Sequence, residues 1–182
     1  PSFAAGPPND FSLLAIDYGF GVLDLITVDE RLHLLFGLRY DRSQLEYDLS
    51  PFPFEGDLSL HDWSYRIGAI YQLTDAFAVF ANFGTAFRPS FRINAAGQSL
   101  FELQESVQYE AGTKLDLFDG RLLLNAAVFH LTNKDVVLSE AVSTDQESIG
   151  AEIDLTARLG ARTTLLFNYG MIDTEYTDGI FE

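Results

Sequence analysis

Cysteine is absent from this 182-residue sequence, which excludes a disulfide scaffold and a thiolate metal site. Basic residues are scarce: 11 Lys and Arg stand against 27 Asp and Glu, for a formal net charge of −16. This charge argues against nucleic acid as a partner, because nucleic-acid phosphates would be repelled. No run of about 18 apolar residues occurs, so no transmembrane helix is predicted.

Apolar residues are nevertheless abundant, at 47% of the chain, and 14% of the residues are aromatic. The chain is therefore expected to fold rather than to remain disordered. A membrane location stays open, because a transmembrane strand needs only about 9–11 residues of alternating polarity.

Alternation of apolar and polar residues is the dominant pattern along the chain. It is clearest in WSYRIGAIYQL (63–73), VQYEAGTKLDL (107–117) and SIGAEIDLTARL (148–159). These runs are about twice as long as the ~5–6 residues typical of strands in soluble proteins. The pattern predicts eight strands, over 17–27, 31–48, 63–73, 77–88, 105–117, 121–134, 147–159 and 162–175.

The expected connections alternate in length. Short turns are predicted at 28–31, 74–76, 118–121 and near Gly160, with Asp119-Gly120 as a strong hairpin signal. Long loops are predicted at 50–62 and 89–104. In an up-and-down meander every second connection lies on the same side, so this is the layout of an outer-membrane barrel.

Aromatic residues on the apolar phase gather near the ends of the strands that meet the long loops. Amphipathic rings settle at membrane–water interfaces, so the set predicts an aromatic girdle. It comprises Tyr40, Trp63, Tyr65, Phe87, Tyr109 and Tyr169.

The stretch FANFGTAFRPSF (80–91) begins as such a strand and then reaches Arg88-Pro89. Proline cannot donate to a strand ladder, so Pro89 is expected to end pairing and release the loop. Arg88 is the next residue on the phase that would face the interior of such a barrel, and it is expected at the barrel rim.

Several segments resemble the barrel of TonB-dependent siderophore receptors. The most specific are FANFGTAFRPS (80–90), the E-x-G-x-K pattern of Glu110, Gly112 and Lys114, and the strand NAAVFHLTNKDV (125–136). GLRYDR (37–42), SIGAEIDLTARL and LLFNYGMIDTEYTDG (165–179) add to the resemblance, which covers nearly the whole chain from Asp17.

The resemblance implies an all-β, antiparallel barrel of 22 strands in the outer membrane of a Gram-negative bacterium, plugged by an N-terminal domain. It implies import of a ferric siderophore with energy passed on by TonB. Residues 1–182 are expected to be part of this barrel domain, from its middle to late region. The plug and the TonB-contacting segment lie outside the sequence. Outer-membrane lipid and lipopolysaccharide are the other expected partners.

No catalytic constellation is found, and the implied protein is not an enzyme; beyond the transported ferric siderophore, no cofactor is expected. Arginine guanidinium groups suit the anionic oxygens of ferric chelates. The candidate ligand-binding arginines are Arg66 on the interior phase, Arg88 at the rim and Arg92 in the following loop. Tyr65, Phe91 and Phe101 are candidates for aromatic contact. Alternatively, these arginines only balance neighbouring carboxylates.

Two other interpretations remain open on the sequence. One is a self-contained eight-stranded membrane barrel filled by its own side chains. The other is a soluble β-sandwich that binds a ligand, in which the apolar phase would pack against a second layer of the same chain. Haem, cobalamin or a sugar are alternative cargoes.

Overall fold

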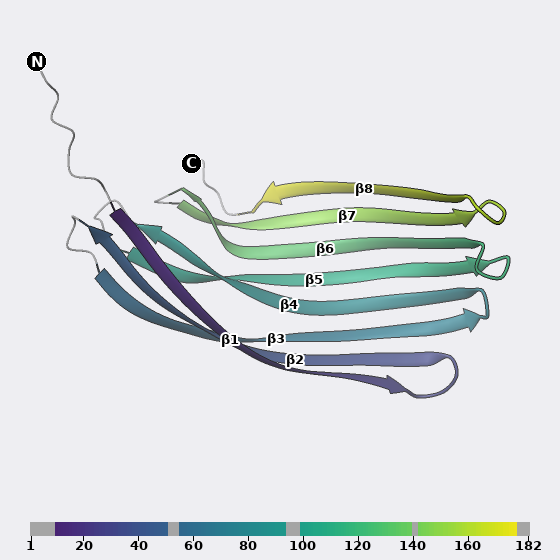
Figure 1. Cartoon of the computed structure of the whole chain (residues 1–182), viewed down its shortest axis with the longest axis horizontal. Helices are drawn as coiled ribbons and strands as arrows, with labels where there is room; N and C mark the ends of the chain where they lie inside the picture. The colour runs from purple at the N-terminus through teal and green to yellow at the C-terminus, as the bar shows by residue number, and fades with distance from the viewer. Residues whose placement is uncertain (1–9, 51–54, 94–98, 140–141, 178–182) are drawn as a thin grey trace, which may run out of the picture.

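The structure, a computed structural model, describes residues 10–50, 55–93, 99–139 and 142–177, all in one antiparallel sheet with its short turns. The strands lie side by side in sequence order (Figure 1). They are β1 (Asp10–Thr27), β2 (Leu32–Ser50), β3 (Glu55–Thr74), β4 (Phe77–Ile93), β5 (Ser99–Leu117), β6 (Leu122–Ser139), β7 (Val142–Arg158) and β8 (Thr164–Tyr176). None of the described residues belongs to a helix that could traverse a bilayer.

All eight predicted strands are present, and their boundaries at the short turns nearly coincide with the prediction. At the opposite end the strands are longer than predicted: β3 begins at Glu55 and β5 at Ser99. The prediction of long loops over 50–62 and 89–104 was therefore wrong for most of their length. These segments continue the strand ladders instead, β3 in register with β2 and β4 in register with β5.

The register brings the apolar phases of all strands onto one face of the sheet, called the apolar face below. One row across it consists of Leu34, Ala69, Ala81, Ala111, Val128, Ala151 and Met171. Ile67 and Ile153, on the same face, are 47% and 40% exposed. No second layer of the described chain covers them, which contradicts the β-sandwich interpretation.

The eight strands form an open sheet. Among the described residues β1 and β8 pair only with β2 and β7, respectively, and not with each other. The self-contained eight-stranded barrel would require that pairing, so the sheet does not support it.

Aromatic rings on the apolar face contact one another across strands about midway along the sheet, because the strands extend beyond the ends at which these rings were predicted. The Tyr40 and Trp63 ring centroids are 5.0 Å apart. The Phe83 ring lies 5.8 Å from that of Tyr65 and 4.9 Å from that of Tyr109. These rings form the core of the predicted girdle, to which the structure adds Phe83.

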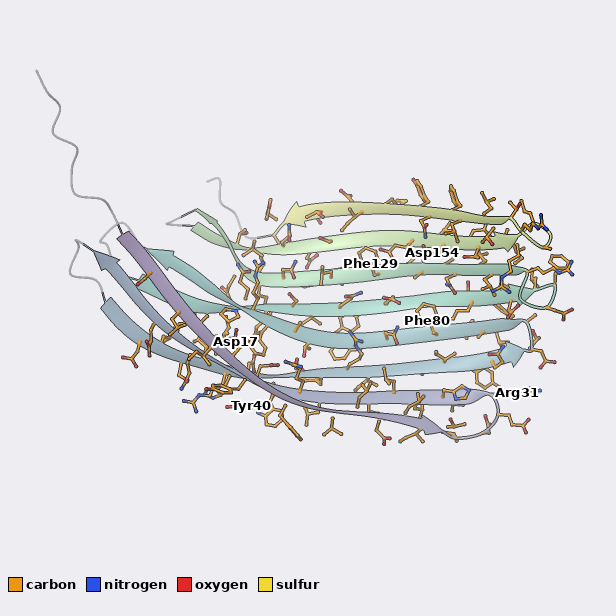
Figure 2. The ribbon with its side chains drawn as sticks, in the orientation of Figure 1. Asp17, Arg31, Tyr40, Phe80, Phe129 and Asp154 are labelled. Atoms are coloured by element: carbon orange, nitrogen blue, oxygen red, sulfur yellow. The ribbon has the colours of Figure 1, made fainter. Side chains whose placement is uncertain are left out.

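The opposite face, called the polar face below, packs aromatic rings over glycines of the neighbouring strand. Phe80 is in register with Gly112, and Phe129 with Gly150; both rings are labelled in Figure 2. A Cβ on Gly112 would meet the Phe80 ring at 2.6 Å and would also collide with the Ala126 carbonyl oxygen. The glycines thus allow the rings to lie flat on the sheet.

Gly112→Ala is expected to destabilise the folded full-length protein by about 1–3 kcal/mol, because the added methyl group overpacks the Phe80 site. Thermal unfolding followed by the gel-mobility shift of the folded barrel would measure this. Gly84→Ala is the matched control, since a Cβ there has its nearest neighbour at 3.8 Å. Equal effects of both substitutions would contradict the packing argument.

The β1–β2 turn is closed by Asp29, whose Oδ1 accepts hydrogen bonds from the backbone N–H groups of Arg31 and Leu32, both at 2.8 Å. These bonds hold the pKa of Asp29 below its ordinary value of 3.8. A carboxyl whose pKa is lower in the folded state stabilises the fold above its unfolded-state pKa. That contribution is lost as the pH falls through the folded-state pKa.

Asp29→Asn is therefore expected to lower the unfolding temperature slightly at pH 7 and to have no effect at a pH below the folded-state pKa. Unfolding midpoints of wild type and variant across this pH range would check it. Asp75→Asn, in the β3–β4 turn, is the control, because the described residues place no backbone N–H group on that carboxylate. A pH-independent effect of Asp29→Asn would disprove the electrostatic account.

Candidate functional site

The pairing of β3 with β4 stops part of the way along the sheet. It runs from the short turn to Arg66, opposite Gly84, and ends there. Beyond this pair, β3 continues alongside β2, and β4 continues alongside β5. The two groups of strands separate toward the end that carries the longer connections (Figure 1). We refer to this separation as the seam.

Thr85 closes the start of the seam. Its hydroxyl oxygen accepts a hydrogen bond from the backbone N–H of Tyr65 at 3.1 Å. A side chain thus satisfies a backbone donor that would otherwise lack a partner in the ladder.

Pro89 explains why β4 tolerates the seam. The backbone N–H of Asp116 in β5 donates a hydrogen bond to the carbonyl oxygen of Ala76, just before β4. Because the backbone groups of successive strand residues point to opposite neighbours, those of even-numbered β4 residues point to β5 and those of odd-numbered ones to β3. Pro89 therefore lacks an N–H group only on the β3 side, where no pairing exists. The prediction that Pro89 ends pairing was wrong. Pro89 lies opposite Leu103 of β5, and the pairing of β4 with β5 continues to Ile93, opposite Ser99.

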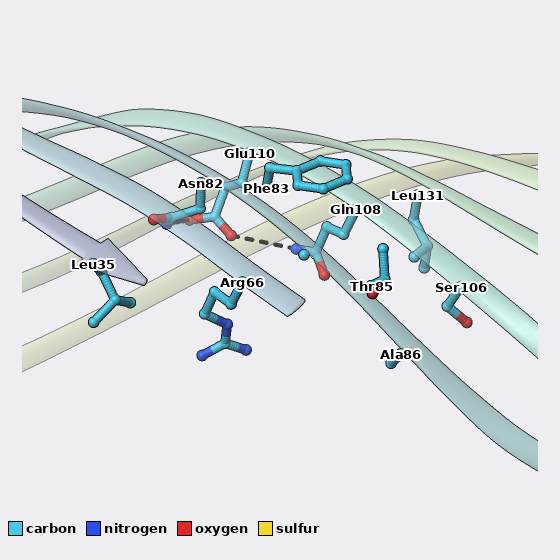
Figure 3. A pocket seen from close by; sticks show the side chains of 11 residues that line it. Leu35, Arg66, Asn82, Phe83, Thr85, Ala86, Ser106, Gln108, Glu110 and Leu131 are labelled. Atoms are coloured by element: carbon cyan, nitrogen blue, oxygen red, sulfur yellow. Dashed lines mark hydrogen bonds between the residues drawn. The ribbon is translucent and has the colours of Figure 1, made fainter. Parts of the chain in front are cut away.

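A pocket of about 320 Å³ lies on the polar face at the start of the seam (Figure 3). Its polar lining includes Arg66, Asn82, Ser106, Gln108 and Glu110. The two carboxylate oxygens of Glu110 accept hydrogen bonds from side-chain amides, from Asn82 at 3.4 Å and from Gln108 at 3.3 Å. Glu110 is therefore held by neutral neighbours rather than by a cation.

Arg66 is the cationic residue of this pocket. Figure 3 shows its guanidinium standing apart from the Glu110 carboxylate. The described residues give it no ion pair and no hydrogen bond. An exposed guanidinium without a protein partner is able to bind the anionic oxygens of a ligand, in a bidentate manner where the ligand allows it.

The other predicted site residues have different surroundings. Arg88 donates from Nη2 to Oε1 of Gln104 at 2.5 Å, and Gln104 is only 7% exposed. Tyr65 lies on the apolar face, opposite to Arg66. Phe91, Arg92 and Phe101 lie in the paired ends of β4 and β5, but their side chains lie outside the described part of the structure.

Sequence reasoning missed an ion pair on the polar face. Arg39 donates from Nε to Asp41 at 2.6 Å and from Nη2 at 2.5 Å. The available signal was the spacing in GLRYDR, because residues two apart in a strand point to the same face. Among the described residues no group of three or more His, Cys, Asp or Glu side chains could hold a metal ion.

Comparisons with known proteins agree with this architecture. The sequence profile described as "TonB dependent receptor-like, beta-barrel" matches residues 6–181. The metal-pseudopaline receptor CntO of Pseudomonas aeruginosa is 32% identical over 167 residues, which cover 85% of this chain and 23% of that protein. The ferrioxamine B receptor of Salmonella typhimurium is 25% identical over 164 residues, 87% of this chain and 23% of that protein.

Solved structures show the same fold. The ferric-catecholate import receptor Fiu of E. coli superimposes with a TM-score of 0.79 at 20% identity, over 93% of this chain and 29% of that one. The siderophore receptor PiuA of Acinetobacter baumannii gives 0.78 at 19% identity, over 91% and 26%. This chain thus spans about a quarter of the length of the proteins it matches. It belongs to the TonB-dependent receptor β-barrel family, whose members are transport receptors in the outer membrane of Gram-negative bacteria.

Proposed function

We propose that the chain is part of a receptor that binds a ferric siderophore and imports it through the outer membrane with energy supplied through TonB. The family membership supports this, and so do the names of relatives that include a ferric-pyoverdine receptor and a ferrioxamine B receptor. The structural observation that carries the proposal is the exposed Arg66 in a pocket on the polar face, where the described part of the chain offers its guanidinium no ion pair.

The polar face corresponds to the interior of the barrel in this proposal. Short turns of outer-membrane barrels lie on the periplasmic side and longer loops on the outer side. The seam and its pocket then open toward the outer side, from which a ferric chelate arrives. The apolar face contacts membrane lipid, and the outer ends of the strands lie beside lipopolysaccharide.

The proposal is tested with the full-length gene in an iron-limited strain that lacks its own siderophore receptors. A panel of iron-loaded hydroxamate, catecholate and carboxylate chelates is supplied, and uptake of radioactive iron is measured with and without a functional TonB. We expect TonB-dependent uptake of at least one chelate. Uptake of none of them would refute the proposal.

Arg88 and Arg92 are tested separately, by Arg88→Ala and Arg92→Ala in the full-length receptor. If both contact the chelate, each substitution should lower its affinity by about tenfold or more, the effect of losing a charge-assisted hydrogen bond. Isothermal titration with the chelate that is transported would measure this. Unchanged affinity would remove the residue concerned from the site and leave Arg88 as a partner of Gln104 alone.

A further inference from the structure

A second, larger pocket of about 570 Å³ lies toward the outer end, where β3 and β4 no longer pair and residues of both strand phases line it. Asp17, Arg39, Asp41 and Arg42 line it, so its four charged residues are two guanidinium groups and two carboxylates. Leu45, Phe87 and Pro89 supply apolar surface. Because Phe87 and Pro89 come from β4 and the others from β1 and β2, this pocket bridges the seam.

Gly19 makes room for the ion pair at the centre of this pocket. A Cβ on Gly19 would collide with Nη2 of Arg39 and with Oδ1 of Asp41. Asp41 engages two of the five N–H donors of a guanidinium, and the Arg39 side chain remains 60% exposed. Arg39 is thus fixed in orientation by Asp41 and keeps donors available for an anionic group.

Asp17 supplies the opposite charge. It is exposed, and the described residues give it no hydrogen bond and no ion pair; Figure 2 labels it on β1. An unpaired carboxylate in the same pocket as an oriented guanidinium is complementary to a ligand that carries an ammonium group beside a carboxylate. A polyanionic ligand would be repelled by Asp17 and by the net charge of −16.

We infer that this pocket binds a metal chelate that carries a free ammonium group and a free carboxylate outside its metal-binding groups, with the carboxylate on Arg39, the ammonium group on Asp17 and the carbon skeleton against Phe87 and Leu45. The inference rests on the proposed function and specifies its ligand. It requires that the two charges of the ligand are recognised separately, so that net charge alone does not determine affinity.

The test uses one ferric trihydroxamate with a single free amine, and three derivatives of that amine. The free amine is cationic, the N-acetyl form neutral, the N-succinyl form anionic, and the N-aspartyl form carries both an ammonium group and a carboxylate. Affinities for the full-length receptor are measured by titration. We expect the N-aspartyl form to bind about tenfold more tightly than the N-acetyl form of equal net charge, and the N-succinyl form to bind most weakly.

Asp17→Asn should abolish the preference for the ammonium group, and Asp17→Lys should invert the order so that the N-succinyl form binds best. Asp116→Asn, on the polar phase beside the β5–β6 turn, is the control and should leave the order unchanged. The gel-mobility shift verifies that each variant is folded.

The outcomes separate this inference from the proposed function. If some chelate is transported but the four probes bind equally, bind undetectably or bind best in the N-succinyl form, the inference is overturned and the receptor function stands. The same holds if Asp17→Lys leaves their order unchanged. If no chelate is transported at all, the proposed function itself fails.

Discussion

Replacing Ala111 by arginine is expected to destabilise the full-length barrel by about 1–3 kcal/mol, the cost of a cationic side chain on the lipid face between the aromatic girdle and the bilayer centre. Ala111 lies in the middle of the row that crosses the apolar face, two residues from Tyr109 on the same strand. The guanidinium there would have hydrocarbon as its neighbour. Unfolding in denaturant with lipid vesicles present would measure the loss.

The matched control is Ala127→Arg, which makes the same change on the adjacent strand but on the polar face. Ala127 is in register with Gly112 on one side and with Glu152 on the other, so a carboxylate is available to the new charge. We expect little loss for this variant. Equal destabilisation by both substitutions would show that the two faces do not differ in environment, and the assignment of the apolar face to lipid would be wrong.

The strand boundaries at the short turns were predictable because local chemistry determines them. The hairpin signal Asp119-Gly120 is confirmed: both residues have positive φ, 56° and 77°, as does Phe118 at 57°. Asp29 closes its turn through hydrogen bonds to residues two and three positions later. Both signals lie within a few residues of sequence, so pattern reasoning finds them.

The boundaries at the outer end were not predictable by the same reasoning. In β3 the alternation on which the prediction depends changes phase there, since Leu58 and Leu60 fall on the phase opposite to that of Trp63. Pro89 was interpreted as the end of pairing because proline has no backbone N–H group and so cannot donate a hydrogen bond to the strand on one side. Which side that is, and whether a partner exists there, depends on β3, about 25 residues earlier in the chain.

In the candidate site, too, local sequence predicts some features, whereas others depend on strands that are distant in the sequence. Arg66 was predictable as an interior residue from its phase within WSYRIGAIYQL. The pocket around it was not, because its walls come from β2 to β6 and depend on where the β3–β4 pairing stops. Asp17 was not a candidate by sequence, because only the fold places it in one pocket with Arg39 and Phe87.

Arg66→Ala is expected to weaken binding of the transported ferric chelate by about 10- to 100-fold, which corresponds to the roughly 1.5–3 kcal/mol of a hydrogen bond to a charged group. The guanidinium has no protein partner among the described residues, so its removal leaves no buried charge behind. The loss should therefore appear in affinity and not in the unfolding temperature. Arg66→Lys should recover only part of the affinity, because an ammonium group cannot bind two oxygens in a fork.

Arg158→Ala is the matched control, since Arg158 is also exposed and lies on the polar phase but at the short-turn end of β7. A ligand that arrives from the outer side and is held at the seam does not contact it, so its loss should leave affinity unchanged. If Arg66→Ala binds the chelate as tightly as wild type does, Arg66 serves only to balance nearby carboxylates such as Glu110. The ligand-binding role would then pass to the pocket formed by Asp17, Arg39 and Asp41.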